Sequence, residues 1–267
     1  MDLQLKDKKA LVTGSTSGIG YGIARELLKE GASVIINGRT EERINNAIIQ
    51  LQKSIPNCSV SGCVADFSNK KQIDQLIASY NSVDILINNV GIFAPKSFVE
   101  ITDEEWFHFF EVNVLSGVRL SRHFLPKMLK QDWGRIIFIS SESGVQIPSE
   151  MIHYGTTKTA QLGVARGLAQ QTAGTNVTVN SVIPGSTRSE GAEKFINDLA
   201  KEKDKTVDEI EREFFDIVRP TCLLKRFATI EEVATFVTYL VSPLAAANNG
   251  AALRVDGGTI PTICLYT

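Results

Sequence analysis

Short apolar runs alternate with segments of helical length along the whole 267-residue chain. The runs occupy residues 10–12, 34–36, 60–64, 85–87, 136–139, 177–183 and 251–255. Between them, apolar residues recur at helical spacing, as at Ile73, Leu76 and Ile77. Continuous apolar strands that alternate with helices are typical of a parallel sheet buried on both faces. The sequence therefore predicts an α/β fold: a doubly wound, Rossmann-type parallel sheet with helices on both faces.

Composition and charge limit the class of protein. Hydrophobic residues make up 43% of the chain and charged residues 22%, a usual globular mix that excludes a disordered chain. The net charge of -2 gives no basic excess for a nucleic-acid partner. The longest apolar runs are of strand size, so we expect neither a transmembrane helix nor a membrane partner. The first six residues lack the apolar core of a secretory signal, which predicts a cytoplasmic protein.

Cysteine and histidine spacing points to neither disulfides nor metal. The residues concerned are Cys58, Cys63, Cys222 and Cys264, together with His108, His123 and His153. The cysteines show no C-x-x-C spacing and the histidines are scattered, so we expect reduced thiols and no metal site. Because repeats and Pro/Gly-rich linkers are also absent from the sequence, we predict one domain over residues 1–267.

Capping boxes mark three helix starts, at residues 102–105, 206–209 and 229–232. The first opens a long predicted helix that reaches Lys130. Residues 187–224 contain no strand-like run and predict two short helices between the last two strands. Long excursions in a compact fold are usually functional, so we expect a helical substrate lid here. Its apolar residues are Phe195, Ile196, Leu199, Ile210, Phe214, Ile217 and Val218; the alternative is that they pack on the core.

A glycine-rich turn follows the first strand and opens a helix. It consists of Gly14, Ser15, Thr16, Ser17, Gly18, Ile19 and Gly20. Glycines let the backbone turn sharply and approach a ligand, and the N–H groups of the helix N-terminus suit a pyrophosphate. The turn therefore predicts a dinucleotide site, with spacing G-x-x-x-G-x-G.

The end of the second strand bears on the choice of cofactor. An NAD site uses an acid there for the ribose 2′-hydroxyl, but this chain has Arg39 and no carboxylate until Glu41. The Arg39 guanidinium suits a 2′-phosphate, which favours NADP over NAD; the alternative is a solvated arginine. Asp66 and Phe67 follow the third strand, and Asp66 either accepts from the adenine amino group or is a loop or helix-cap aspartate.

Tyr154 and Lys158 lie four residues apart on a predicted helix ending near Gly174, so both side chains face the same way. An ammonium about 4 Å from a phenol is expected to lower the pKa of Tyr154 toward the working pH, where acid–base catalysis is most effective. Ser140 and Ser141 end the fifth strand, where a hydroxyl can bond a substrate oxygen. Asn113 lies inside the long predicted helix.

Together, these motifs resemble the short-chain dehydrogenase/reductase family, in its compact branch that includes 3-oxoacyl carrier-protein reductases. The matching residues are Thr13, Gly14, Gly18, Ile19 and Gly20 in the cofactor turn; Asn88, Asn89, Val90 and Gly91 at a strand end; Asn113, Ser141, Tyr154 and Lys158 in the catalytic tetrad; and Pro184, Gly185 and Thr187 in the nicotinamide loop. Val90 replaces the family's usual alanine. Ser141 rather than Ser140 matches because it lies thirteen residues before Tyr154.

The resemblance implies an NAD(P)-dependent oxidoreductase acting on a small-molecule ketone or secondary alcohol. Tyr154 would transfer the proton, Lys158 would lower its pKa and hold the nicotinamide ribose, and Ser141 would orient the substrate oxygen. Asn113 would expose a main-chain carbonyl that holds a proton-relaying water. Arg39 matches the NADP position, although the family's second basic marker inside the turn is absent.

The resemblance also implies a homotetramer, with which the apolar helix over residues 102–130 and the tail over residues 259–267 are compatible. The alternative function is a regulatory dinucleotide-binding protein without turnover. The sequence leaves the substrate and the direction of reaction open.

Overall fold

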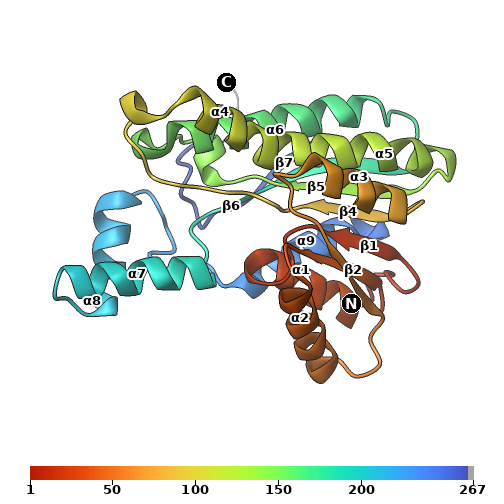
Figure 1. Cartoon of the computed structure of the whole chain (residues 1–267), viewed down its shortest axis with the longest axis horizontal. Helices are drawn as coiled ribbons and strands as arrows, with labels where there is room; N and C mark the ends of the chain where they lie inside the picture. Colours follow the sequence, from red (N-terminus) through yellow and green to blue (C-terminus); the bar gives the residue numbers. More distant parts are fainter. Residues whose placement is uncertain (264–267) are drawn as a thin grey trace.

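The computed structural model describes residues 1–263, and seven strands in this part form one parallel sheet. The spatial order is β3-β2-β1-β4-β5-β6-β7 (Figure 1). The strands are β1 (Lys9–Val12), β2 (Ser33–Gly38), β3 (Val60–Val64), β4 (Ile85–Asn88), β5 (Gly134–Ile139), β6 (Val177–Pro184) and β7 (Ala252–Val255). Every predicted apolar run became a strand, so the predicted doubly wound α/β fold is confirmed.

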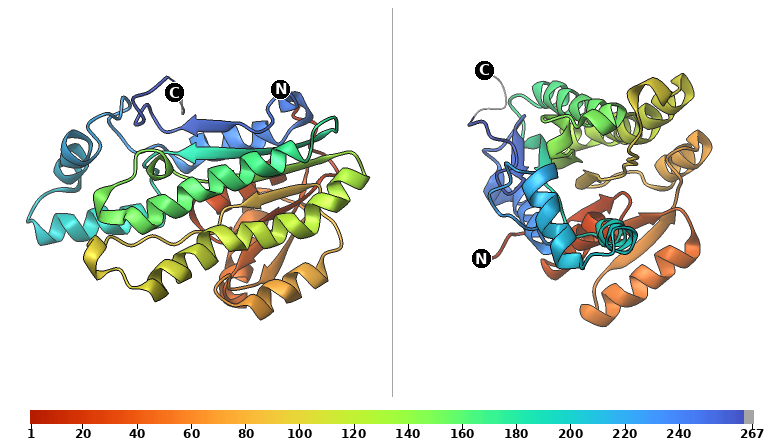
Figure 2. Two further views of the ribbon diagram at one scale, coloured as in Figure 1. Left: turned by 90° about the horizontal axis from the view of Figure 1, so that it is seen from above. Right: turned by 90° about the vertical axis from the view of Figure 1, so that its left-hand side faces the viewer.

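Helices cover both faces of the sheet (Figure 1). One face carries α1 (Gly18–Lys29), α2 (Glu41–Ser54) and α9 (Ile230–Leu240). The other face carries α3 (Lys70–Ser79), α5 (Ser116–Lys130) and α6 (Ile152–Gln170), with α4 (Asp103–Phe110) leading into α5. α7 (Glu190–Glu202) and α8 (Val207–Glu213) project at the end toward which the strand arrows point (Figure 2).

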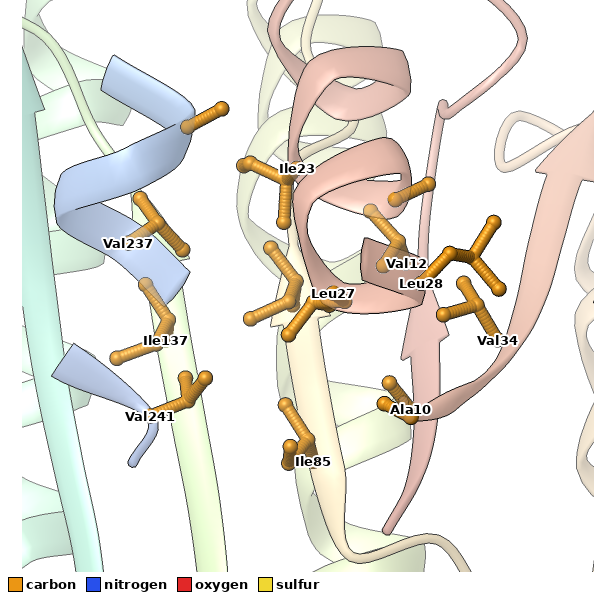
Figure 3. Packing of buried hydrophobic residues seen from close by; sticks show 14 of the residues in the cluster. Ala10, Val12, Ile23, Leu27, Leu28, Val34, Ile85, Ile137, Val237 and Val241 are labelled. Atoms are coloured by element: carbon orange, nitrogen blue, oxygen red, sulfur yellow. The ribbon is translucent and has the colours of Figure 1, made fainter. Parts of the chain in front are cut away.

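The core consists of two apolar layers, one on each side of the sheet. Alternate residues of β1 serve the two layers: Ala10 and Val12 pack with α1 and α9, while Leu11 packs on the opposite side. Figure 3 shows Ile23 and Leu27 of α1 beside Val237 of α9, over the strands. Fully burying one aliphatic side chain contributes about 1.5–3 kcal/mol to the stability of the fold. These layers therefore hold the strands in place, and with them the strand ends that carry the predicted site residues.

All three predicted capping boxes are present. The side chains of Thr102, Thr206 and Thr229 each accept a hydrogen bond from the backbone N–H three residues on, and the glutamate carboxylate at that position accepts one from the threonine's backbone N–H. The helix that carries Tyr154 ends at Gln170, short of the predicted Gly174.

The long helix predicted over residues 102–130 is not uniform. A turn of π-helix (Glu111–Leu115) separates α4 from α5 and contains Asn113. π-helical turns inside α-helices are frequent at functional sites. Their hydrogen-bond pattern differs from that of the α-helix, so it changes which backbone carbonyls accept hydrogen bonds within the helix.

The 187–224 segment contains the two predicted helices and a π-helical turn (Phe214–Val218). Its inner apolar side chains form a separate small cluster that includes Ile196, Ile210 and Phe215, with Leu199 and Phe214 packed against it. The predicted apolar faces thus pack mainly on each other. Phe195, Ile217 and Val218 remain exposed.

Of the predicted tail, residues 264–267 lie outside the described part of the chain, and so does Cys264. Cys58, Cys63 and Cys222 are free thiols. Among the described helices, none has the length and apolar content needed to cross a bilayer.

Candidate active site

A cavity of about 360 Å³ lies beyond the carboxyl ends of β1, β2, β3 and β4. The sheet order reverses between β1 and β4, the position where doubly wound sheets bind ligands. Predicted residues that line this cavity are Gly14, Thr16, Ser17, Arg39, Asp66, Phe67, Asn89, Val90 and Gly91. The structure therefore brings four sequence-predicted cofactor segments together, one after each of these strands.

The backbone conformation of the glycine turn requires glycine at two of its positions. Gly14 has a φ of +59°, a conformation that favours glycine. A Cβ on Gly20 would lie 2.4 Å from the carbonyl oxygen of Gly14, so only glycine fits there. α1 begins at Gly18, directly after Thr16 and Ser17, which line the cavity. The N-terminus of α1 therefore opens at the cavity, where it can hold a phosphate group.

Two predicted residues of the turn, Ser15 and Ile19, do not line the cavity and instead make contacts inside the protein. The Ser15 hydroxyl donates to the carbonyl of Val12 and accepts from the Asn37 N–H, and Ile19 packs against the core. Thr13, the first residue of the matching turn, accepts at Oγ1 from the N–H groups of Asn89 and Val90. It joins the ends of β1 and β4.

Cationic side chains line the β2 end of the cavity. Arg39 is exposed there, and Arg43 of α2, which sequence reasoning missed, joins it. The signal for Arg43 was its place in the first turn of α2, the helix that follows β2 and Arg39. Asp66 accepts at Oδ1 from the backbone N–H and the hydroxyl of Ser68, and these bonds lower the pKa of its carboxyl. His108 of α4 also lines the cavity and was not predicted.

These groups fit a nicotinamide dinucleotide. The helix N-terminus suits the pyrophosphate, Arg39 and Arg43 suit a 2′-phosphate, and Asp66 lies in the same cavity as an acceptor. At the other end a Cβ on Gly91 would lie 3.2 Å from Lys158 Nζ, so the cavity leads to the predicted catalytic lysine.

Lys158 is buried on α6, and its Nζ donates to the carbonyl of Ile139 at 2.9 Å. Burial lowers the pKa of Lys158 to about 8. The same nitrogen lies 5.7 Å from the centre of the Tyr154 ring. The two side chains therefore share one face of the helix, as predicted.

The pKa of Tyr154 is shifted in the direction opposite to the predicted one. Burial raises it to about 12, and the hydrogen-bonding Ser141 hydroxyl only partly offsets this. The expected lowering by Lys158 assumed a charge about 4 Å away. Instead, the ammonium is turned toward Ile139, and its own lowered pKa weakens the charge. The desolvation of the phenolate therefore dominates.

Asn113 holds the π-helical turn against α6. Its Oδ1 accepts from the Ile92 N–H at 2.8 Å, and its Nδ2 donates to Thr157 Oγ1 at 2.9 Å. Its main-chain carbonyl accepts from the Gln161 side-chain amide, at the position where a relaying water was expected. Gln161 was missed; its signal was a place three residues after Lys158, on the same helix face.

The two serines after β5 have different roles. The Ser140 hydroxyl donates to the main-chain carbonyl of Lys158 and so ties the end of β5 to α6. The Ser141 hydroxyl lies near Tyr154 and donates to the Glu142 carboxylate at 2.7 Å. This favours Ser141 for the substrate. Glu142 was missed, although it follows Ser141 directly.

The predicted nicotinamide loop lies at the end of β6, outside the lining of the cavity. Pro184 is the last residue of β6, the Gly185 N–H donates to the carbonyl of Val255, and the Thr187 hydroxyl donates to the carbonyl of Gly185.

Comparison with known proteins decides the family. The family model described as short chain dehydrogenase matches residues 8–200. The chain belongs to the short chain dehydrogenase family. It is 49% identical to an uncharacterized oxidoreductase, YvaG, of Bacillus subtilis, over 98% of this chain and 100% of the relative. It is 33% identical to the 3-oxoacyl-[acyl-carrier-protein] reductase FabG of Aquifex aeolicus, over 97% and 99% of the two chains.

Among solved structures, this short chain dehydrogenase is similar to L-sorbose reductase from Gluconobacter frateurii complexed with NADPH and L-sorbose. The TM-score is 0.92 and the identity 31%, over 98% of this chain and all of the other. The family resemblance seen in the sequence is thus confirmed, and the protein is an NAD(P)-dependent oxidoreductase of this family.

Proposed function

We propose that this short chain dehydrogenase interconverts a ketone and a secondary alcohol with NADP(H), using Tyr154 as the general acid and base. The observation that carries the proposal is the close approach of Lys158 to Gly91: its Nζ lies 3.2 Å from the place that a Cβ on Gly91 would occupy. Through it the dinucleotide cavity leads to the buried lysine, and Tyr154 lies one helical turn away from that lysine.

The chain's own residues handle the proton. A bound nicotinamide supplies or accepts the hydride. Tyr154 donates a proton to the carbonyl oxygen in reduction and removes it from the alcohol in oxidation. Its raised pKa keeps the phenol protonated, which favours the acid role. Ser141 orients the substrate oxygen, while Asn113 and Gln161 hold the helices that position Lys158.

NADP is the proposed cofactor. Arg39 and Arg43 give one end of the cavity two guanidinium groups, which suit a 2′-phosphate. The similarity to a reductase complexed with NADPH supports the same choice.

For the substrate we propose a molecule with an apolar portion, in preference to a small, fully hydroxylated sugar. A second cavity of about 320 Å³ separates residues 146–150 from the 187–224 segment. Ile147, Ile217 and Val218 line it, and all three are exposed. The segment would close over this cavity as a lid, excluding water from the reaction.

We also propose a cytoplasmic homotetramer. Phe107 of α4 and Leu115 before α5 are exposed apolar residues, and Phe98 and Val99 lie exposed before α4. Exposed apolar groups of this kind mark association surfaces. Sedimentation at micromolar concentration should give a tetramer; a monomer would contradict the proposal.

A panel of ketones and secondary alcohols with NADPH or NADH, followed by nicotinamide absorbance, tests the activity. We expect turnover that is faster with NADPH and with partly apolar substrates. Tight cofactor binding without turnover of any substrate would favour a regulatory dinucleotide-binding protein instead.

A further inference from the structure

One exposed aromatic side chain lies directly beside the proposed proton donor. Phe93 is 63% exposed, which by itself is ordinary for a single apolar residue. Its position is what matters: the centre of its ring lies 6.0 Å from that of the Tyr154 ring, with an angle of 61° between the two planes. This edge-to-face geometry is one that aromatic pairs prefer. The proton transfer and the cofactor site described above give Phe93 no role.

The backbone around Phe93 runs from one cavity to the other. Ile92, directly before it, lines the dinucleotide cavity. Three residues after Phe93, the N–H of Lys96 donates to the carbonyl of Glu150 at 2.8 Å, and Glu150 lines the second cavity. Phe93 therefore lies at the junction of the two cavities, where a cofactor, a substrate and Tyr154 would meet.

Asn113 holds the backbone at this junction in place. Its side-chain oxygen accepts from the N–H of Ile92 at 2.8 Å, and its side-chain nitrogen donates to the carbonyl of Ile92 at 3.0 Å. One buried side chain thus satisfies both backbone polar groups of the residue before Phe93. An anchored backbone loses little freedom when a ligand binds, so Phe93 is well placed to form one wall of a binding site.

Ile147 forms an apolar wall at the next position of the same helix. A Cβ on Gly155 would lie 2.6 Å from Ile147 Cγ2, so the Ile147 side chain lies over Gly155, the residue after Tyr154. Ile147 is exposed and lines the second cavity. The start of α6 is therefore flanked by an aromatic side chain beside Tyr154 and an aliphatic one over Gly155.

We propose that Phe93 is a specificity-determining residue that packs against an aromatic ring of the substrate, next to the reacting carbon. The inference rests on the proposed function, because it assumes that the reacting carbon is held at Tyr154. The substrate ring must be close to that carbon, since Phe93 packs on the very phenol that transfers the proton. Aromatic pairs gain stability beyond the burial of apolar area, which a saturated ring of the same size does not provide. The other substituent of the reacting carbon faces Ile147.

Two ketones of similar size test the preference: acetophenone, whose ring is aromatic, and cyclohexyl methyl ketone, whose ring is saturated. We expect the wild type to reduce acetophenone with the higher kcat/KM; the opposite order would contradict the proposal. The ratio of the two values should fall about fivefold in Phe93→Leu, which loses the ring, and stay within about twofold in Phe93→Tyr, which keeps it. Ile147→Ala should lower both values by a similar factor, because the two ketones share their methyl group.

Phe98→Ala is the matched control for Phe93→Ala. Phe98 is 58% exposed and belongs to the exposed apolar group before α4. The kcat/KM for acetophenone should fall roughly tenfold in Phe93→Ala, because apolar contact is lost together with the ring, and should not change in Phe98→Ala. Sedimentation of Phe93→Ala checks its assembly. Dissociation of this variant with equal losses for the two ketones would overturn the proposal, because it would assign Phe93 to contact between subunits.

Binding of acetophenone in the presence of NADP⁺ separates this inference from the proposed function. The oxidised cofactor has no hydride to give, so acetophenone is not reduced and its Kd can be measured by NMR titration. We expect the Kd to rise about fivefold in Phe93→Leu but not in Phe98→Ala. If the wild type binds acetophenone in this way but reduces no ketone, the proposed function fails and the aromatic subsite stands. If the wild type reduces ketones, a ratio that Phe93→Leu leaves unchanged overturns the inference alone.

Discussion

The ammonium nitrogen of Lys158 lies 5.7 Å from the centre of the Tyr154 ring and donates its hydrogen bond to the carbonyl of Ile139. Both side chains belong to one face of α6, yet the lysine is anchored on the strand side. Burial therefore governs both groups: it lowers the pKa of Lys158 to about 8 and raises that of Tyr154 to about 12.

The lowered pKa of Lys158 predicts a pH-dependent stability. Between pH 8 and 10.5 the unfolded chain binds the lysine proton and the folded chain does not, so the free energy of unfolding rises with pH in this window. The slope is at most about 1.4 kcal/mol per pH unit. Urea unfolding of the cofactor-free protein below pH 8 and near pH 10 measures it.

Lys158→Met is the reference for this measurement. The stability of the wild type relative to this variant should improve as the pH rises through the window. A difference that is constant with pH would show that Lys158 titrates normally. Tyr154 acts in the opposite sense between pH 10 and 12, but both proteins carry it, so its contribution cancels in the difference.

Arg39→Asp should change the cofactor preference. The substitution removes a guanidinium from the cavity and places a carboxylate against the 2′-phosphate. Hydrogen bonds to charged groups contribute about 1.5–3 kcal/mol, so the Kd for NADPH should rise at least tenfold while that for NADH changes little. Fluorescence titration with both cofactors measures this.

Arg122→Asp, an identical charge change at an exposed position on α5, is the control and should leave both affinities unchanged. A wild type that already prefers NADH would show that Arg39 is only a solvated surface arginine.

Gly20→Ala should damage the cofactor turn. The new Cβ would lie 2.4 Å from the Gly14 carbonyl oxygen, a backbone atom, so the turn must shift. We expect a loss of about 1–3 kcal/mol in stability, typical of overpacking, and at least tenfold weaker cofactor binding. Thermal unfolding and cofactor titration measure the two effects.

Gly163→Ala is the matched control for this substitution. Gly163 lies inside α6, and among the described residues nothing lies within 4 Å of its built Cβ. The substitution should raise stability by about 0.5–1 kcal/mol, because alanine is the better helix former. Equal effects of the two substitutions would show that the turn is not crowded.

The sequence predicted the parts of the molecule that depend on local patterns. A parallel strand buried on both faces is typically a continuous apolar run, so β5 was visible from residues 136–139. A capping box needs only four consecutive residues, so Thr102 could be placed as a helix start. The glycine turn was recognisable because Gly14 and Gly18 adopt positive φ and a Cβ on Gly20 would meet the Gly14 carbonyl oxygen.

The features that were missed depend on residues far apart in the chain. The π-helical turn at Asn113 is held by Thr157 and Gln161 of another helix. Glu142 and Arg219, which form an ion pair, are separated by 77 positions. The direction of the Tyr154 pKa depends on burial in the assembled site, which helical spacing alone does not report.

The account depends most on Tyr154 as the proton donor, and Tyr154→Phe tests this directly. The substitution removes only the hydroxyl, and general acid–base catalysis is typically worth about 10²–10⁴-fold. We measure kcat by nicotinamide absorbance and the cofactor Kd by titration, with Tyr239→Phe on α9 as the same change elsewhere. The account predicts a loss of kcat of at least a hundredfold in Tyr154→Phe alone, with the Kd changed by less than about threefold; a kcat close to that of the wild type would contradict it.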